Sequence, residues 1–162
     1  MKFKLYDFSR KGLLRLLIFG TAVLLITRFV FMPFHVSGYS MEPNCPDGSF
    51  AFVSAVSYLV SDPGRGDILV ARTSRPPYMY ILKRVIGLPG ETVSIRSGIV
   101  FINGKRLREP YTKINPAWNL PPVHIGKDRY YLIGDNRNMP LEMHLHREVS
   151  VDNIIGEVVL FF

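Results

Sequence analysis

The 162-residue sequence has few of the residues that build disulfide frameworks and zinc sites. Its single cysteine, Cys45, cannot form an intramolecular disulfide, and its four histidines occur without the Cys/His spacing of a zinc finger. Low-complexity composition is also absent, because 48% of the residues are hydrophobic and 20% are charged. The sequence therefore excludes disulfide-stabilised, zinc-finger and collagen-like proteins, and its length and apolar content predict one packed domain.

The excess of positive charge lies at the N-terminus. The chain has a formal net charge of +7. Residues 1–28 contain six basic residues and one acidic residue, whereas residues 29–162 contain 14 basic and 12 acidic residues. A nucleic-acid-binding protein normally carries its positive charge on the folded domain. This distribution therefore argues against nucleic acid as a partner.

A hydrophobic segment follows the first basic residues. Residues 16–27 contain no charge, and residues 13–32 are interrupted only by Arg15 and Arg28. Twenty helical residues reach about 30 Å, the thickness of a bilayer core, and terminal arginines can extend to the headgroups. We therefore expect a cytoplasmic N-terminus over residues 1–12, a transmembrane anchor over residues 13–32 and an extracytoplasmic domain over residues 33–162.

Two other interpretations of the hydrophobic segment are a buried core helix and a cleaved signal peptide. A core helix does not explain the five basic residues within the first fifteen positions. A cleaved signal peptide is followed by small residues at the cleavage site, whereas residues 29–36 read FVFMPFHV and are bulky. The sequence therefore favours an uncleaved anchor in the inner or plasma membrane.

Short segments typical of β-strands fill the chain after residue 33. They are rich in β-branched and aromatic residues and lie at 49–56, 67–72, 79–86, 91–96, 98–103, 129–133 and 154–161. Asn103-Gly104 and Ser97-Gly98 are turn dipeptides. No sustained helical period occurs after residue 34. These patterns predict an all-β domain with an antiparallel sheet, in which the proline-rich residues 107–128 form an extended excursion.

Ser40 and Lys83 are the candidate catalytic pair. Ser40 lies between Gly38 and Pro43, in a segment that could also be an ordinary loop. Lys83 lies in the strand expected at 79–86, where alternation puts it on the same face as Ile81 and Val85. A lysine on an apolar face either protects an edge strand or, when desolvated, loses its proton near neutral pH. Such a lysine can activate a serine hydroxyl without a histidine.

A serine protease triad is the alternative arrangement around Ser40. It would require His124, His144 or His146 beside the serine, and the local sequence gives no support for any of them. His144 and His146 are expected in a polar loop.

Four segments of the chain resemble the type I signal peptidases, membrane-bound Ser/Lys endopeptidases that remove signal peptides from exported proteins. The matching segments are SMEP at 40–43, RGDIL at 65–69, KRVIGLPGE at 83–91 and GDNR at 134–137. Each segment alone could occur by chance. Four in the family's order behind an N-terminal hydrophobic segment are highly specific, and the resemblance covers essentially residues 13–162.

The resemblance implies a role for each matching residue. Ser40 would be the nucleophile, Lys83 the general base and the backbone N–H of Ser40 an oxyanion-hole donor. Residues implied at the oxyanion hole and substrate pockets are Ser37, Gly38 and Met41, and Gly38 occupies the position where many relatives carry a second oxyanion-hole serine. Supporting residues implied by the resemblance are Asp67, Arg84, Gly134, Asp135, Asn136 and Arg137. Asp67 and Arg137 are equally explained as a turn carboxylate and a surface guanidinium. No metal or cofactor is implied.

The last matching segment departs from the family pattern after residue 137. Relatives usually carry a serine that orients the lysine at the position of Pro140, and an aspartate at the position of Glu142. Proline has no side-chain donor. Either packing and another group hold Lys83, or the chain works differently from better-known members or has lost activity.

The resemblance implies exported preproteins as substrates and membrane lipid as a partner, and it does not predict an oligomeric state. Two alternative functions stay open. One is a peptidase of the same chemistry that matures conjugation pilins, and the other is a non-catalytic membrane-tethered β domain that binds exported chains.

Overall fold

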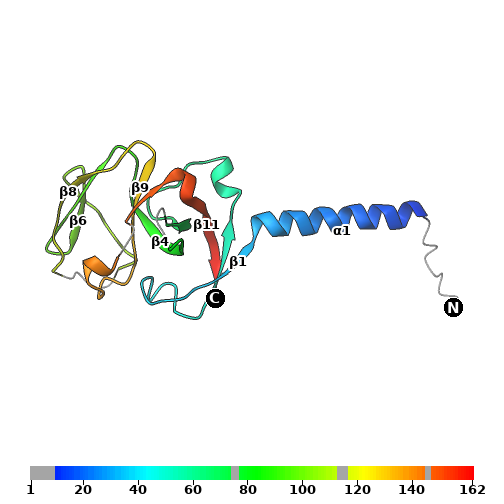
Figure 1. The fold of residues 1–162 in the computed structure, drawn as a ribbon, viewed down its shortest axis with the longest axis horizontal. Coiled ribbons are helices and arrows are strands. Elements are labelled where there is room, and N and C mark those ends of the chain that lie inside the picture. The colour runs from blue at the N-terminus through cyan, green and yellow to red at the C-terminus, as the bar shows by residue number, and fades with distance from the viewer. Residues whose placement is uncertain (1–9, 74–76, 113–116, 145–146) are drawn as a thin grey trace.

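The computed structural model describes residues 10–73, 77–112, 117–144 and 147–162. Two antiparallel sheets make up the domain after residue 31, as the sequence predicts (Figure 1). The larger sheet has the strand order β1-β2-β11-β3-β4-β9-β10, formed by β1 (Met32–His35), β2 (Phe50–Ser54), β11 (Ile154–Phe161), β3 (Ile68–Arg72), β4 (Tyr80–Gly87), β9 (Arg129–Ile133) and β10 (Glu148–Ser150). The smaller sheet has the order β7-β6-β5-β8, formed by β7 (Lys105–Arg106), β6 (Ile99–Ile102), β5 (Thr92–Arg96) and β8 (Leu120–His124).

All seven segments expected to be strands form strands, and the two turn dipeptides join β5 to β6 and β6 to β7. Ser97 and Asn103 have φ values of 48° and 50°, and Gly98 and Gly104 follow at 76° and 78°. Consecutive residues in this left-handed region form the tight turns that match the twist of a hairpin. The position of each dipeptide therefore predicts where one strand of the hairpin ends and the next begins.

Four short strands were not expected from the sequence: β1, β7, β8 and β10. Two of them contain prolines, namely Pro33 in β1 and Pro121 with Pro122 in β8. Both strands lie at the edge of a sheet, where a missing backbone N–H costs no ladder hydrogen bond. The proline-rich excursion at 107–128 therefore includes an edge strand of the smaller sheet.

Helix α1 (Arg10–Val30) extends away from the β domain, on the side opposite to β6 and β8 (Figure 1). Among the residues that the structure describes, no helix is long and apolar enough to cross a membrane. The expected transmembrane anchor over residues 13–32 is therefore not supported. The uncharged stretch at 16–27 reaches only about 18 Å as a helix, against about 30 Å for a bilayer core. Most of the N-terminal segment at 1–12 lies outside the described residues.

The end of β4, from Val85, and β9 after Arg129 are buried on both faces and therefore connect two hydrophobic clusters. Val85 and Leu132 belong to the cluster that also contains Leu69 and Val149. The next residues, Ile86 and Ile133, point the other way and belong to the cluster completed by the smaller sheet; this cluster includes Val93, Ile95, Val100, Trp118 and Ile125. Because side chains alternate along a strand, β4 and β9 bind both halves of the domain together.

The two sheets pack closely at Gly87, the last residue of β4. A Cβ atom at this position would lie 2.3 Å from Cδ1 of Ile125 and 2.6 Å from Cγ2 of Val93. Real Cβ contacts are never this short, so the side chains around Gly87 would have to move apart.

We expect Gly87→Ala to lower the free energy of unfolding by about 1–3 kcal/mol, because overpacking displaces buried side chains. Gly126→Ala is the matched control, since a Cβ atom there meets its nearest neighbour, Arg129 Cδ, at 3.4 Å. Urea unfolding of both variants measures the difference. Equal stability losses would show that the sheets do not depend on the close approach at Gly87.

Candidate active site

Ser40 and Lys83 line one cleft with a volume of about 250 Å³. Ser37, Gly38 and Met41 line the same cleft, so the structure brings together every residue expected at the catalytic and substrate-binding positions. The remaining lining residues are Phe34, His35, Val36, Val70, Tyr80, Ile81 and Leu82. A larger cavity of about 450 Å³ lies beside β6 and β7 and contains none of the residues that the sequence singled out.

The cleft lies between β1 and the first half of β4. Three strands separate these two in the sheet order, yet the rings of Phe34 and Tyr80 lie 5.7 Å apart. The larger sheet must therefore be strongly curved, which follows from the accumulated twist of its strands. This curvature places the Ser40 loop, which follows β1, beside Lys83.

Lys83 is 8% exposed and pairs with Leu69 in the β3–β4 ladder. Burial lowers the pKa of its ammonium group from 10.5 to about 8, and the Asp135 carboxylate opposes this shift. With this pKa, the ammonium group of Lys83 loses its proton at mildly alkaline pH. It is therefore electrostatically suited to act as a base.

The turn at residues 134–136 holds the backbone of Ser40. The N–H of Asn136 donates to the carbonyl oxygen of Ser40 at 3.0 Å, and its side-chain amide donates to the carbonyl oxygen of Tyr39 at 2.9 Å. Gly134 packs so closely that a Cβ atom there would lie 2.1 Å from the Ser40 oxygen. Among the described residues, no acceptor takes up the N–H of Ser40.

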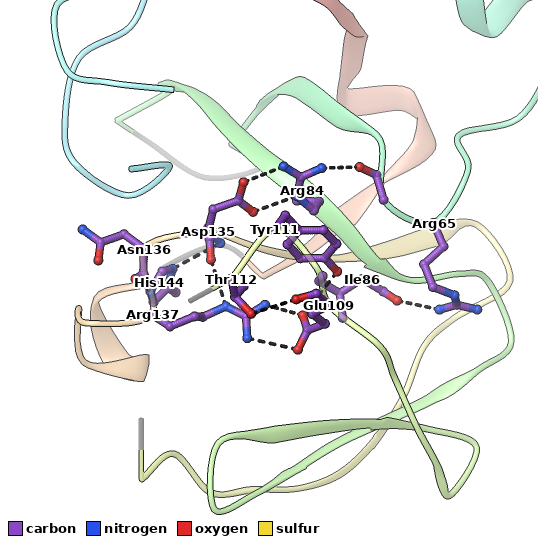
Figure 2. A network of polar contacts seen from close by, with 12 residues as sticks. Arg65, Arg84, Ile86, Glu109, Tyr111, Thr112, Asp135, Asn136, Arg137 and His144 are labelled. Atoms are coloured by element: carbon purple, nitrogen blue, oxygen red, sulfur yellow. Dashed lines mark hydrogen bonds and ion pairs between the residues drawn. The ribbon is translucent and has the colours of Figure 1, made fainter. Parts of the chain in front are cut away.

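Asp135 is 3% exposed and pairs with Arg84 (Figure 2). The Nε and Nη2 atoms of Arg84 donate to the two carboxylate oxygens at 2.7 and 2.5 Å, and Nη1 donates to the carbonyl oxygen of Gly66 at 2.6 Å. Asn44 donates to the same carboxylate at 2.8 Å, and the Tyr111 ring lies 4.1 Å from the guanidinium carbon of Arg84. This ion pair thus joins three of the four matching segments, and Asn44 lies directly after the fourth, SMEP at 40–43.

Arg137 is 3% exposed, so its interpretation as a surface guanidinium is wrong. It forms a two-pronged ion pair with Glu109 and donates to the carbonyl oxygen of Gly134 at 3.2 Å (Figure 2). Its guanidinium also lies over the ring of Trp118. Arg137 therefore ties the proline-rich excursion to the turn that holds Ser40.

Asp67 caps a turn before β3. Its carboxylate accepts the N–H of Gly64 at 2.7 Å and the hydroxyl of Tyr58 at 3.3 Å. It does not line the cleft. The turn-carboxylate interpretation therefore describes Asp67.

Sequence reasoning missed Glu109, Tyr111 and the burial of His144. His144 was expected in a polar loop but is 1% exposed, and its ring nitrogens contact the backbone of Gly134 and Asn136 rather than Ser40. His124 is exposed in β8, and His146 lies outside the described residues. Among the described residues, no group of three or more His, Cys, Asp or Glu side chains could hold a metal ion.

Comparison with known proteins identifies the family. A family model described as signal peptidase, peptidase S26, matches residues 9–162. Two probable signal peptidases from Synechocystis, I-1 and I-2, are 32% and 34% identical to this chain; the alignments cover 97% and 88% of this chain and 84% and 69% of theirs.

A solved structure gives independent support. The crystal structure of a signal peptidase I from Enterococcus faecalis superimposes with a TM-score of 0.51 and 26% identity, covering 61% of this chain and 98% of that one. The family match thus spans the four motifs as well as the fold that brings them together. This chain belongs to the signal peptidase family, peptidase S26.

Proposed function

We propose that this chain removes signal peptides from exported preproteins, with Ser40 as nucleophile and Lys83 as general base. The observation that carries the assignment of these residues is that Ser40 and a desolvated Lys83 line the same cleft. A non-catalytic binding domain gives no reason to bury a lysine beside a serine. Family membership supports the same reaction.

Lys83 acts in both halves of the reaction. Its neutral amine accepts the proton of the Ser40 hydroxyl as the oxygen attacks the scissile carbonyl carbon. The N–H of Ser40 stabilises the resulting oxyanion. Collapse of this intermediate breaks the peptide bond, and Lys83 returns its proton to the leaving amine. Water, deprotonated by Lys83, then attacks the acyl-enzyme; the bond to the Ser40 oxygen breaks, Lys83 returns the proton to that oxygen, and the signal peptide is released.

The substrate binds as an extended chain between two strand edges. The outer edge of β1 carries no partner strand among the described residues, and β4 pairs with β9 only from Arg84 onward. Among the described residues, none pairs with the backbone of residues 80–83 on the side away from β3, so a peptide can add hydrogen bonds there. Gly38 contributes no side chain, and Val70 and Ile81 are apolar, which suits small uncharged substrate residues.

Lipid covers helix α1 in this proposal, with the β domain on the extracytoplasmic side where exported preproteins arrive. Among its described side chains, the helix exposes ten large hydrophobic ones: Leu13, Leu14, Leu16, Leu17, Ile18, Phe19, Val23, Leu24, Leu25 and Ile26. An apolar surface of this kind is unfavourable in water, and the basic residues at both ends of α1 suit anionic headgroups.

The catalytic assignment predicts that Lys83→Arg and Ser40→Ala abolish cleavage of a model preprotein. Arginine keeps the positive charge but does not lose its proton. In the wild type, kcat/KM should rise with pH through about 8, because that is the pKa of the buried Lys83. Lys105→Arg, at an exposed position in β7, is the control and should leave the profile unchanged. Wild-type cleavage by Lys83→Arg would exclude Lys83 as the base.

A second prediction separates the electrostatic role of Asp135 from its structural role. Asp135→Asn removes the negative charge that raises the pKa of Lys83, so the rise in kcat/KM should move to a pH below 8. The same change leaves Arg84 without its ion-pair partner, which should cost about 3–5 kcal/mol of stability.

Glu109→Gln is the matched control for Asp135→Asn. It breaks the other buried ion pair, but Glu109 does not contribute to the pKa shift of Lys83. It should therefore lower the free energy of unfolding without moving the pH profile. A profile that moves equally in both variants would contradict the charge effect.

The lipid contact predicts that the protein floats with liposomes that contain anionic lipid. Replacing Leu16, Phe19 and Leu24 together by Glu should abolish flotation, since these side chains are 60–70% exposed on α1. Val60→Glu adds a charge at an exposed position of the β domain and serves as the control. Flotation of the triple variant would show that α1 does not contact the membrane.

A further inference from the structure

His144 lies behind the turn that holds Ser40. It follows the short 3-10 helix at Leu141–Met143 and packs edge-on against Trp118, with ring centroids 4.9 Å apart. Its Nδ1 accepts the N–H of Gly134 at 3.3 Å, and its Nε2 lies 3.2 Å from the carbonyl oxygen of Asn136. Both ring nitrogens thus contact the backbone of residues 134–136, and Figure 2 shows the ring beside Asp135, Asn136 and Arg137.

Only one protonation state of His144 satisfies both contacts. Nδ1 must be unprotonated to accept from Gly134, and Nε2 must carry the proton to donate to Asn136. Burial lowers the pKa of His144 to about 4, and the cations around it, Lys83 on β4 with Arg137 and Arg147, act in the same direction. The ring is therefore neutral over the pH range in which Lys83 titrates.

The same turn joins His144 to the nucleophile. Asn136 accepts from His144 through its carbonyl oxygen, and through its N–H it donates to the carbonyl oxygen of Ser40. Gly134 lies between the imidazole and that oxygen, because a Cβ atom there would be 3.0 Å from the ring and 2.1 Å from the Ser40 oxygen. A movement of the imidazole is therefore transmitted to the Ser40 peptide.

We propose that His144 is a positioning residue for the Ser40/Lys83 centre, whose neutral imidazole clamps the turn at 134–136 and so fixes the direction of the Ser40 hydroxyl and N–H. The inference rests on the proposed function. Pro140 removes a side-chain donor from this segment, and His144, four residues later, is the polar group that the segment brings against the active-site turn. It acts through the backbone and has no part in proton transfer to the substrate.

The test compares three variants on a model preprotein in detergent. His144→Phe keeps an aromatic ring against Trp118 but loses both hydrogen bonds, and should lower kcat about 10- to 100-fold with KM within about twofold of the wild type. His144→Asn places an amide oxygen where Nδ1 lies, so it keeps the bond to Gly134 and should recover part of kcat. His124→Phe makes the same exchange at an exposed position of β8 and should leave both constants unchanged.

Two results would overturn the positioning role of His144. One is a folded His144→Phe variant with wild-type kcat, and the other is a His144→Phe variant in which only KM changes. If His144→Phe does not fold, ¹⁵N NMR of the wild-type imidazole decides, because the clamp requires the neutral tautomer protonated on Nε2 and the other tautomer excludes it. Ser40→Ala separates the two hypotheses: undiminished cleavage by Ser40→Ala refutes the proposed function, whereas an inactive Ser40→Ala beside a fully active His144→Phe refutes only the clamp.

Discussion

The site depends on one buried carboxylate, that of Asp135. A buried charge is stable only when its partner and remaining hydrogen bonds are in place, since desolvation costs several kcal/mol for each ion. Arg84 supplies two hydrogen bonds and Asn44 a third. Because Gly134 and Asn136 flank Asp135 in the chain, fixing the carboxylate also fixes the turn that holds Ser40. The carboxylate therefore sets the position of Ser40 without contacting it.

The same ion pair sets the position of Lys83. Lys83 and Arg84 are neighbours in β4, so their side chains point to opposite faces of the strand. Anchoring Arg84 to Asp135 and to the Gly66 carbonyl oxygen holds β4 in place and leaves Lys83 directed into the cleft. Burial lowers the pKa of Lys83 while the Asp135 carboxylate keeps it from falling further.

The sequence predicts the central strands well because their signals are local. Their β-branched and aromatic residues identify β4 and β9, and the dipeptides at 97–98 and 103–104, with positive φ values, locate the turns between β5 and β6 and between β6 and β7. The motifs likewise point to Ser40 and Lys83. Glu109 and His144 could not be found in this way, because each looks like an ordinary surface residue among polar or proline-rich neighbours. Their burial arises from contacts with residues 28 and ten positions away, which no local pattern encodes.

The hydrophobic N-terminal segment shows the opposite error, in which a clear local pattern suggests more than the structure supports.

The polar segment after residue 137 explains how the site tolerates Pro140. With φ −53° and ψ 144°, this proline starts the 3-10 helix in extended backbone and directs Leu141 into the core cluster. That anchor brings His144 inside, three residues later, with Trp118 covering its ring. A proline that looks like the loss of an active-site group therefore fixes the path of the chain that delivers another polar group to the turn at 134–136.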